Sequence, residues 1–379
     1  MRFTTVSIAV NASPIFFEER MGELYDRILD MNNLYSAYIE CQKEVSWKCS
    51  VQRYGANVLA NLCSLRRSLE THTYRQKPFF EFDLNERGKM RHIKALDISD
   101  RVLQRALCDY VLNPVIRKHI IYDNGASVKG RGIGFARKRI KVHLQRYYRK
   151  HGNNGYALLI DFHKYFDSIP HDKVIRKLSE IIQDGEVMGL VEYLLSTFGN
   201  GKSVGIGAQI SQSVGVFYPT EIDNWCKTVM GCKYYERYND DTVILHESRE
   251  FLVRLLDGYK RLAAKLGLVV HEFKTRIVPL RKGFSIMKMR YLLSDTGKIT
   301  VIPNKDGIKR ERQRIKKLAR MELDCERPKG TVREQYRSWR GNIIKYNAYK
   351  SVRNMDALYK SILEENHGRE RNDGRGEAD

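Results

Sequence analysis

Two adjacent carboxylates, Asp240 and Asp241, lie between two apolar, β-rich runs in the segment YYERYNDDTVILHES, residues 234–248. Runs of this kind around a short polar segment predict a β-hairpin with both carboxylates at its tip. Asp and Asn are favoured turn residues, so a tight connection alone would also explain the tip. Two neighbouring carboxylates repel each other unless a cation lies between them, and the pair is therefore a candidate metal site.

Asp161 is the candidate for a third carboxylate. It directly follows the apolar run YALLI in the segment YALLIDFHKYFDSIPH, which is typical of a buried strand that ends in a loop. A helix cap would explain Asp167 and Ser168, but it fits Asp161 less well. Three converging carboxylates could hold two Mg²⁺ ions, which activate a primer 3′-hydroxyl and stabilise a leaving pyrophosphate.

The charge of the chain narrows the class of partner. The 379 residues include 67 Lys and Arg but only 45 Asp and Glu, which gives a formal net charge of +22. This excess indicates a polyanionic partner, with nucleic acid ahead of an anionic membrane surface. No apolar run is long enough to predict a membrane span. Seven scattered cysteines without a CxxC pair indicate the reducing cytoplasm.

Periodicity predicts a chain of mixed helices and strands. Apolar steps of three and four residues predict helices from about residue 20 to about residue 75, and a further helix that begins at Ser99 or Asp100 and ends near Pro114. Alternation predicts a hairpin in KPFFEFDLNERGKMRHIKALDIS, with NERGK as its turn. From about residue 305 the chain is basic and helical, and its last residues are too polar to predict structure.

Taken together, these motifs resemble those of bacterial reverse transcriptases. DFHKYFDSIPH resembles the first catalytic motif of that family, and YNDD resembles the second, which usually reads Tyr-any-Asp-Asp. Their order, their separation of roughly eighty residues and the glycine-rich segment between them match the family. The resemblance runs from about residue 25 to about residue 360.

The resemblance implies an α+β fold of the right-hand polymerase type. The expected segments are an N-terminal extension (1–24), fingers with N-terminal helices (25–150), a palm with the antiparallel catalytic sheet (151–300), a helical thumb (301–364) and a disordered tail (365–379).

The resemblance also implies roles around the metals. Asp161 and Asp240 would ligate two Mg²⁺ ions, with Mn²⁺ as a possible substitute, and Asp241 would lie beside them. The carbonyl of Phe162 would help to hold the second ion. Phe166 falls where the family has its sugar gate, and a bulky ring there would clash with a 2′-hydroxyl.

A second set of residues is predicted to contact the nucleotide. GIGAQISQ falls at the template and nucleotide loop, which in many members reads Gln-Gly, three residues, then Ser-Pro. Here Ile206 and Gln212 replace the Gln and the Pro, while Gly207 and Ser211 remain and Gln209 lies between them. This departure resembles the reverse transcriptases of diversity-generating retroelements, and some antiphage-defence enzymes also depart from the usual loop. A glycine turn before a helix explains the segment as well.

Three cations complete the predicted nucleotide site. Lys89 and Arg91 alternate on one strand of the early hairpin, which in the family grips the triphosphate; cations on an edge strand also deter aggregation. Lys274 resembles a family lysine near the pyrophosphate, where it could act as a general acid. A solvated surface lysine is an equally good explanation of Lys274.

Basic helical segments are predicted to bind RNA. FARKRIKVHLQRYYRK, residues 135–150, contains no acidic residue and includes two tyrosines, which suits an RNA backbone with stacked bases. Charge runs are more often only solvated helix faces. The segments IKRERQRIKKLAR and REQYRSWRGN resemble the thumb. The predicted RNA-binding residues are Lys129, Arg131, Arg137, Lys138, Arg139, Arg146 and Trp339.

The sequence thus predicts an enzyme that copies RNA into DNA. The expected partners are dNTPs, the DNA product and a dedicated, structured non-coding RNA template; an accessory protein or a second copy of the chain stays open, and no membrane partner is expected. The alternatives are a decayed RNA-binding scaffold and a two-metal nuclease. Without a retron Val-Thr-Gly signature or a maturase or endonuclease extension, antiphage defence and diversity generation are the expected roles.

Overall fold

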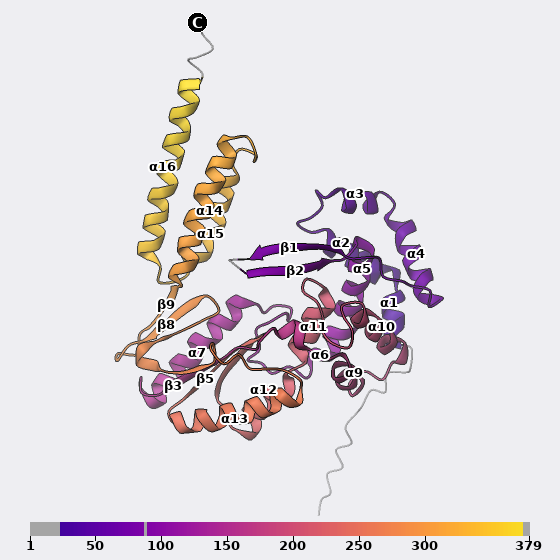
Figure 1. The fold of residues 1–379 in the computed structure, drawn as a ribbon, viewed down its shortest axis with the longest axis horizontal. Helices are drawn as coiled ribbons and strands as arrows, with labels where there is room; N and C mark the ends of the chain where they lie inside the picture. The colour runs from indigo at the N-terminus through magenta and orange to yellow at the C-terminus, as the bar shows by residue number, and fades with distance from the viewer. Residues whose placement is uncertain (1–22, 87–88, 374–379) are drawn as a thin grey trace, which may run out of the picture. The chain divides into compact units, whose positions relative to one another are not determined.

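The computed structural model describes residues 23–86 and 89–373 of the chain. These residues form two compact units, whose helices and strands are labelled in Figure 1. The first unit comprises the described residues up to Lys118 together with Pro170–Val214, and the second comprises His119–Ile169 and the described residues from Gly215 onward. The predicted N-terminal extension (1–24) lies almost wholly outside the described residues.

The first unit is mainly helical and carries one hairpin. Tyr25 of α1 and Asp184, the N-cap of α10, join its two chain segments, because the Tyr25 N–H donates to the Asp184 carboxylate at 3.0 Å. The helices are α1 (Glu23–Leu29), α2 (Met31–Gln42), α3 (Cys49–Ala56), α4 (Val58–Glu70), α5 (Ile98–Leu107), α6 (Asn113–Arg117), α9 (His171–Ser179) and α10 (Gly185–Ser196), and α11 (Gln209–Phe217) begins here.

The predicted hairpin is confirmed. Strands β1 (Phe80–Glu86) and β2 (Lys89–Ala95) pair antiparallel from Phe80 opposite Ala95 to Glu86 opposite Lys89. The two turn residues, 87 and 88, lie outside the described part of the chain.

The predicted start of α5 was wrong. Asp97, not Ser99 or Asp100, caps the helix, and its carboxylate accepts from the Ser99 N–H at 3.0 Å. Asp100 is instead buried and accepts from the Tyr74 hydroxyl at 2.8 Å and the Lys77 N–H at 3.1 Å. Because Asp97 already accepts a hydrogen bond from a free N–H group of the first turn, Asp100 is not needed as a cap and forms tertiary contacts instead.

The predicted end of this helix near Pro114 was also wrong. A π-helical segment, η1 (Cys108–Leu112), leads directly into α6 (Asn113–Arg117). Pro114 lies near the start of α6, directly after this widened segment, in which the Asn113 N–H donates to the Cys108 carbonyl five residues back. The helical path therefore continues through the proline.

The second unit is built on a four-stranded antiparallel sheet in the order β4-β5-β3-β6. Helix α7 packs on one face, where its Ile140 and Leu144 belong to the same buried core as Leu159 and Val243. On the other face lies α13, where the hydroxyl oxygen of Tyr259 is 3.4 Å from the hydroxyl oxygen of Thr242. The elements are α7 (Ile133–His151), β3 (Tyr156–Ile160), α8 (Tyr165–Ser168), α12 (Thr220–Asn224), η2 (Trp225–Val229), β4 (Tyr234–Tyr238), β5 (Asp241–His246), α13 (Arg249–Lys265) and β6 (Arg276–Pro279).

The loop before α7 covers the outer edge of β4. The Arg237 N–H donates to the Asp123 carbonyl at 3.1 Å, and the Gly125 N–H donates to the Arg237 carbonyl at 3.0 Å. Asn124 forms the bridge between them. A side chain at Gly125 would lie 2.7 Å from the Ala136 methyl group, so only glycine fits this close approach.

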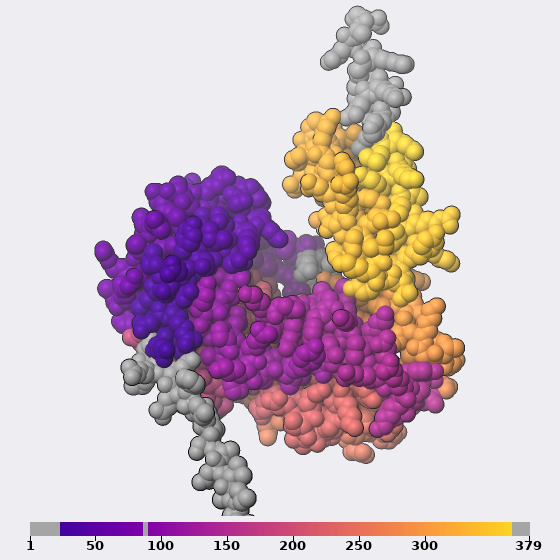
Figure 2. Space-filling model, turned by 180° about the vertical axis from the view of Figure 1, so that it is seen from behind, coloured from indigo at the N-terminus to yellow at the C-terminus, as the bar shows by residue number. Residues whose placement is uncertain are grey.

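A three-stranded sheet and three helices complete the second unit. Helices α14, α15 and α16 pack side by side around a core of Ile315, Val332 and Met355 (Figures 1 and 2). A tail was predicted to be disordered from residue 365, whereas α16 continues to Asp373; extending a helix that has already formed costs less than starting one. The elements are η3 (Leu280–Lys282), β7 (Phe284–Ile286), β8 (Met289–Leu293), β9 (Ile299–Pro303), α14 (Lys305–Leu323), α15 (Thr331–Ile343) and α16 (Tyr349–Asp373).

The two units divide the chain differently from the predicted segments. Residues 119–150, predicted to belong to the fingers, lie in the second unit because α7 packs on the four-stranded sheet. Residues 170–214, predicted to belong to the palm, lie in the first unit. Within the described residues, no helix combines the length and the apolar character needed to cross a bilayer.

Candidate active site

Two strand ends bring three carboxylates together in the second unit. Tyr238 pairs with Asp241, so Asn239 and Asp240 form a two-residue hairpin turn, with Asn239 in the left-handed region at φ +52°. Ile160 pairs with Thr242, which places Asp161, the next residue, beside Asp241. Asp161 and Asp241 line one cavity of about 260 Å³.

The crowding of these carboxylates changes their acidity. Burial, together with the negative charges of Asp240 and Asp161, raises the pKa of Asp241 to about 7. Without a cation, Asp241 is therefore only about half ionised at neutral pH. A divalent cation would favour the ionised form, so the donor set fits a metal site.

A lysine already places positive charge at these carboxylates. The Lys274 ammonium donates to both oxygens of Asp161, each at 2.8 Å, and Lys274 lines the same cavity. Lys274 and Lys288 also act to lower the pKa of Asp241. Lys274 thus lies beside the candidate metal-binding carboxylates, and its contact to a pyrophosphate stays a prediction.

The two predicted aromatic residues have different environments. Phe162 is buried and stacks between Tyr165 and Tyr259, with ring centroids 5.4 and 5.8 Å away. Phe166 is half-buried against Tyr165, and a side chain at Gly215 would lie 2.8 Å from its ring. Gly215 therefore leaves the space that the Phe166 ring occupies.

Comparison with known proteins identifies the family. Residues 77–303, more than half of the chain, match the family described as reverse transcriptase (RNA-dependent DNA polymerase). The chain belongs to this family. Family membership and the antiparallel sheet that carries the carboxylates confirm the predicted α+β fold of the right-hand polymerase type.

No curated protein matches this reverse transcriptase. Among solved structures, it is similar to telomerase from Candida albicans in complex with a TWJ fragment of telomeric RNA, with a TM-score of 0.48 and 12% identity. The match covers 76% of this chain and 55% of the telomerase chain. The reverse transcriptase thus spans about half the length of that neighbour.

A buried ion pair that the sequence did not predict supports the catalytic turn. Arg237 and Asp223 have no exposed side-chain surface, and the guanidinium donates to both Asp223 oxygens at 2.6 to 3.0 Å. The same guanidinium donates to the carbonyl of Asn239 at 3.2 Å and to that of Val216 at 2.8 Å. Arg237 therefore holds the turn that carries Asp240.

The predicted loop and hairpin residues belong to the first unit. Gly207 has φ +105°, a conformation that favours glycine, and Gln209 begins α11. Ser211 is buried, and its hydroxyl donates to the Val204 carbonyl. Arg91 lies on β2 and Gln212 on α11, while the side chain of Lys89 lies outside the described residues. Their contacts to a nucleotide stay predictions.

Three of the predicted RNA-binding arginines are engaged within the second unit. Arg137 donates to the Met287 carbonyl and the Tyr346 hydroxyl. Arg139 pairs with Asp123, and Arg131 donates to two carbonyls of the loop before α7. Trp339 packs against the core of α14, α15 and α16. Lys129, Lys138 and Arg146 are exposed.

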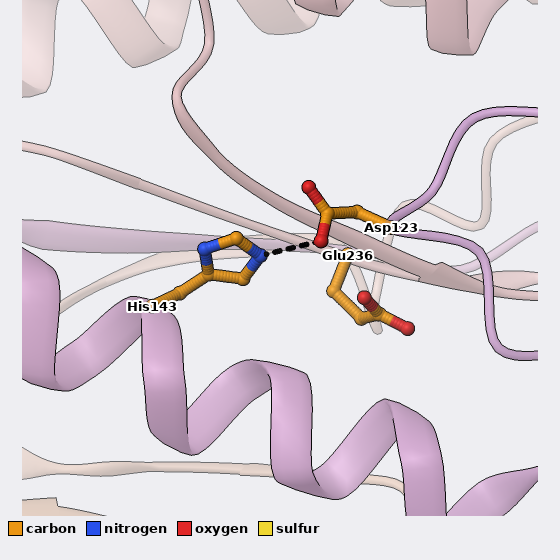
Figure 3. Close-up of side chains that lie close together, drawn as sticks. All are labelled: Asp123, His143 and Glu236. Atoms are coloured by element: carbon orange, nitrogen blue, oxygen red, sulfur yellow. Dashed lines mark ion pairs between the residues drawn. The ribbon is translucent and has the colours of Figure 1, made fainter.

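Three buried polar side chains, the Asp123 cluster, lie beneath the covered edge of β4 (Figure 3). The cluster consists of Asp123, His143 of α7 and Glu236 of β4, with ligand-type atoms within 4.8 Å of one another. The carboxylate oxygens of Asp123 lie 2.7 Å from a nitrogen of Arg139, 3.0 Å from that of Lys227 and 3.1 Å from that of His143. Burial opposes its ionisation, yet His143 and Lys227 hold the pKa of Asp123 well below its usual value.

These contacts favour a structural clamp over a metal site. Arg139 contacts Oδ1 of Asp123 through two nitrogens and Lys227 contacts Oδ2, so cations of the chain already engage both carboxylate oxygens. Arg139 and Lys227 also compensate the negative charge of Asp123. The Asp123 cluster therefore fastens the loop before α7 to α7 and β4.

Glu236 makes the stability of this clamp depend on pH. Burial raises the pKa of Glu236 to about 9, and neither carboxylate oxygen has a hydrogen-bond partner among the described residues. A carboxyl whose pKa is raised on folding keeps its proton in the folded state while the unfolded chain loses it. Its contribution to stability is therefore complete at acid pH and is lost as the pH rises toward 9.

Replacing Glu236 by glutamine should remove this dependence. Between pH 7 and pH 9 the wild-type chain should lose about 2 kcal/mol more stability than the Glu236→Gln variant, because one group contributes about 1.4 kcal/mol per pH unit. Urea unfolding at several pH values measures the difference, with the exposed Glu221→Gln as control. Parallel pH profiles for wild type and Glu236→Gln would contradict the assignment.

Proposed function

We propose that this chain is an RNA-directed DNA polymerase that adds deoxynucleotides to a primer 3′-end at Asp161, Asp240 and Asp241. The observation that carries the proposal is the convergence of these carboxylates from two strand ends, with Asp161 and Asp241 on one cavity beside Lys274. Carboxylates so arranged repel one another and favour divalent cations. The family of the chain consists of RNA-dependent DNA polymerases, which supports the same reaction.

The cofactor in this proposal is a pair of Mg²⁺ ions, with Mn²⁺ as a substitute. Asp161, Asp240 and Asp241 would hold them, and the carbonyl of Phe162 would assist. Bound there, the ions would supply Lewis-acid stabilisation of the attacking and leaving oxygens. The Lys274 ammonium neutralises the charge of Asp161 and occupies both of its oxygens. Movement of Lys274 away from Asp161 would free both carboxylate oxygens for metal ligation.

Selection of deoxynucleotides is assigned to Phe166. Its ring packs against Tyr165 and lies close to the backbone of Gly215. These contacts restrict movement of the ring away from a 2′-hydroxyl. Replacing Phe166 by alanine should therefore increase the incorporation of ribonucleotides relative to deoxynucleotides, as measured by competition in primer extension. An unchanged ratio would remove this role.

RNA binding is assigned to the exposed face of α7 rather than to its engaged arginines. The exposed cations on this helix make no ion pair among the described residues, and they span about 18 Å of the helix at 1.5 Å per residue. A row of uncompensated cations suits an RNA backbone. These cations are Lys138, Lys141, Arg146, Arg149 and Lys150.

Removing three of these charges should weaken RNA binding in a salt-dependent way. For the triple glutamine variant at Lys138, Lys141 and Arg149, the slope of log K against log salt should fall by about two to three units. Fluorescence anisotropy with a labelled RNA at increasing KCl measures the slope. The control replaces the exposed α13 cations Arg254, Lys260 and Arg261; an equal change there would refute a specific role for α7.

The biological role is proposed as antiphage defence or diversity generation in a prokaryotic cytoplasm. The substitution of Ile206 and Gln212 into the template and nucleotide loop supports both roles. The template would be a dedicated structured RNA. Sequencing the cDNA made in cells that express the chain distinguishes the two: copies of a repeat from a variable gene indicate diversification, and copies of a separate non-coding RNA indicate defence.

Primer extension on an RNA template tests the proposed reaction. With dNTPs and Mg²⁺, a labelled DNA primer should lengthen, and product should be absent without the cation. Shortened strands would instead indicate a nuclease. Tight RNA binding without extension, on several templates and with Mn²⁺ as well, would indicate a scaffold.

A further inference from the structure

A concavity of about 510 Å³ lies between the end of α15 and one face of α16, remote in sequence from the catalytic carboxylates. Arg340 and Ile344 form one side, and Tyr346 lies in the connection between the helices. Tyr349 and Arg353 line it from α16. Its volume is within the range of small-molecule sites, about 300 to 1,000 Å³. We call it the α15–α16 pocket.

The charges of this pocket favour an anion. Asp356 is its acidic side chain, and it is compensated by Arg340 at 3.2 Å and by the hydroxyl of Tyr336 at 2.7 Å. Arg353 and Lys360 also line the pocket, are exposed, and make no ion pair with any described residue. Two uncompensated cations therefore face the same concavity.

An aromatic side chain extends this basic surface. Tyr349 is 78% exposed at the start of α16. Arg353 follows it by about one helical turn and Lys360 by about two more turns, so the three side chains share one face of the helix, at 5.4 Å per turn. An exposed ring followed by cations can stack a base and bind the phosphates attached to it.

We propose that the α15–α16 pocket binds a nucleoside phosphate, with the base against Tyr349 and the phosphates at Arg353 and Lys360. The ligand is a free nucleoside triphosphate or an unstacked nucleotide of single-stranded RNA, since both present the same base and phosphate. This site does not involve Asp161, Asp240 or Asp241, so it stands independently of the proposed polymerase reaction.

Equilibrium binding to the full-length chain tests the site. EDTA is present and Asp240 is replaced by alanine, so that metal-dependent binding at the carboxylates does not contribute. One probe is ATP with a fluorescent label on its ribose, and the other is a labelled six-nucleotide oligo(A) RNA. Tyr349→Ala and Arg353→Gln should each weaken binding by about tenfold, as expected when one stacking or phosphate contact is lost. Unchanged thermal unfolding verifies that the variants are folded.

Lys350→Gln is the matched control, because Lys350 is exposed on the same helix, carries the same charge and does not line the pocket. It should change binding less than twofold. Loss of ATP binding in the pocket variants identifies a free nucleotide as ligand, and loss confined to the oligonucleotide identifies single-stranded RNA. Equal weakening by Lys350→Gln and Arg353→Gln, or no binding of either probe, would overturn the proposal.

Discussion

Replacing Asp240 by alanine should lower the rate of primer extension by at least about 10³-fold, equivalent to about 4 kcal/mol of barrier. Asp240 lies at the tip of the β4–β5 turn, and its charge raises the pKa of Asp241. Its removal takes one carboxylate from the three that would hold the metals. Single-nucleotide extension under saturating Mg²⁺ measures the loss.

The same substitution should not destabilise the chain. Because Asp240 repels the carboxylates near it, its removal should leave the melting temperature in EDTA unchanged or slightly higher, and should lower the pKa of Asp241. Replacing the exposed Asp257 of α13 by alanine is the control for a lost surface carboxylate. Retention of more than about a tenth of the activity by Asp240→Ala would exclude a metal-binding role for this residue.

Replacing Arg237 by methionine should cost about 3 to 5 kcal/mol of folding stability, because it leaves the buried Asp223 carboxylate without its partner. The hydroxyl of Tyr235 also donates to Asp223, at 2.5 Å, and would still donate to it after the substitution. Urea unfolding measures the cost, and the exposed Arg254→Met is the control. A loss below about 1 kcal/mol would show that the pair does not stabilise the unit.

A double variant separates folding from positioning. Replacing Asp223 by leucine together with Arg237 by methionine removes both charges, and should restore much of the lost stability. Activity should stay low, because the guanidinium that held the carbonyls of Asn239 and Val216 is still absent. The loss should appear in kcat rather than in KM for the dNTP. Full recovery of kcat would reduce Arg237 to a purely structural role.

Local pattern predicted the parts of the fold that depend on neighbouring residues. The two hairpins and the ends of β3 and β5 follow from alternation and from turn residues, so the approach of Asp161 to Asp241 could be anticipated. The cap of α5 could not, because Asp97, Ser99 and Asp100 are all good caps. The tertiary contacts of Asp100 with Tyr74 and Lys77 decide between them.

Long-range packing decided what the sequence did not predict. Adjacent residues of a strand point to opposite faces, so Glu236 and Arg237 in YYERYNDD place one charged side chain on each face of β4, yet both are fully buried. Glu236 points toward α7 and Arg237 toward α12, because helices cover both faces of the sheet. In the same way, no local signal shows that Arg137 and Arg139 are engaged while Lys138 between them is exposed.

The pairing of residues 123–125 with Arg237 has a consequence for assembly. An unprotected outer strand can recruit a strand from another molecule, which leads to aggregation or to augmentation by a partner. Here the backbone groups of Arg237 are already used by Asp123 and Gly125. An accessory subunit or a second copy of the enzyme would therefore have to recognise side chains elsewhere, and could not lengthen this sheet at Arg237.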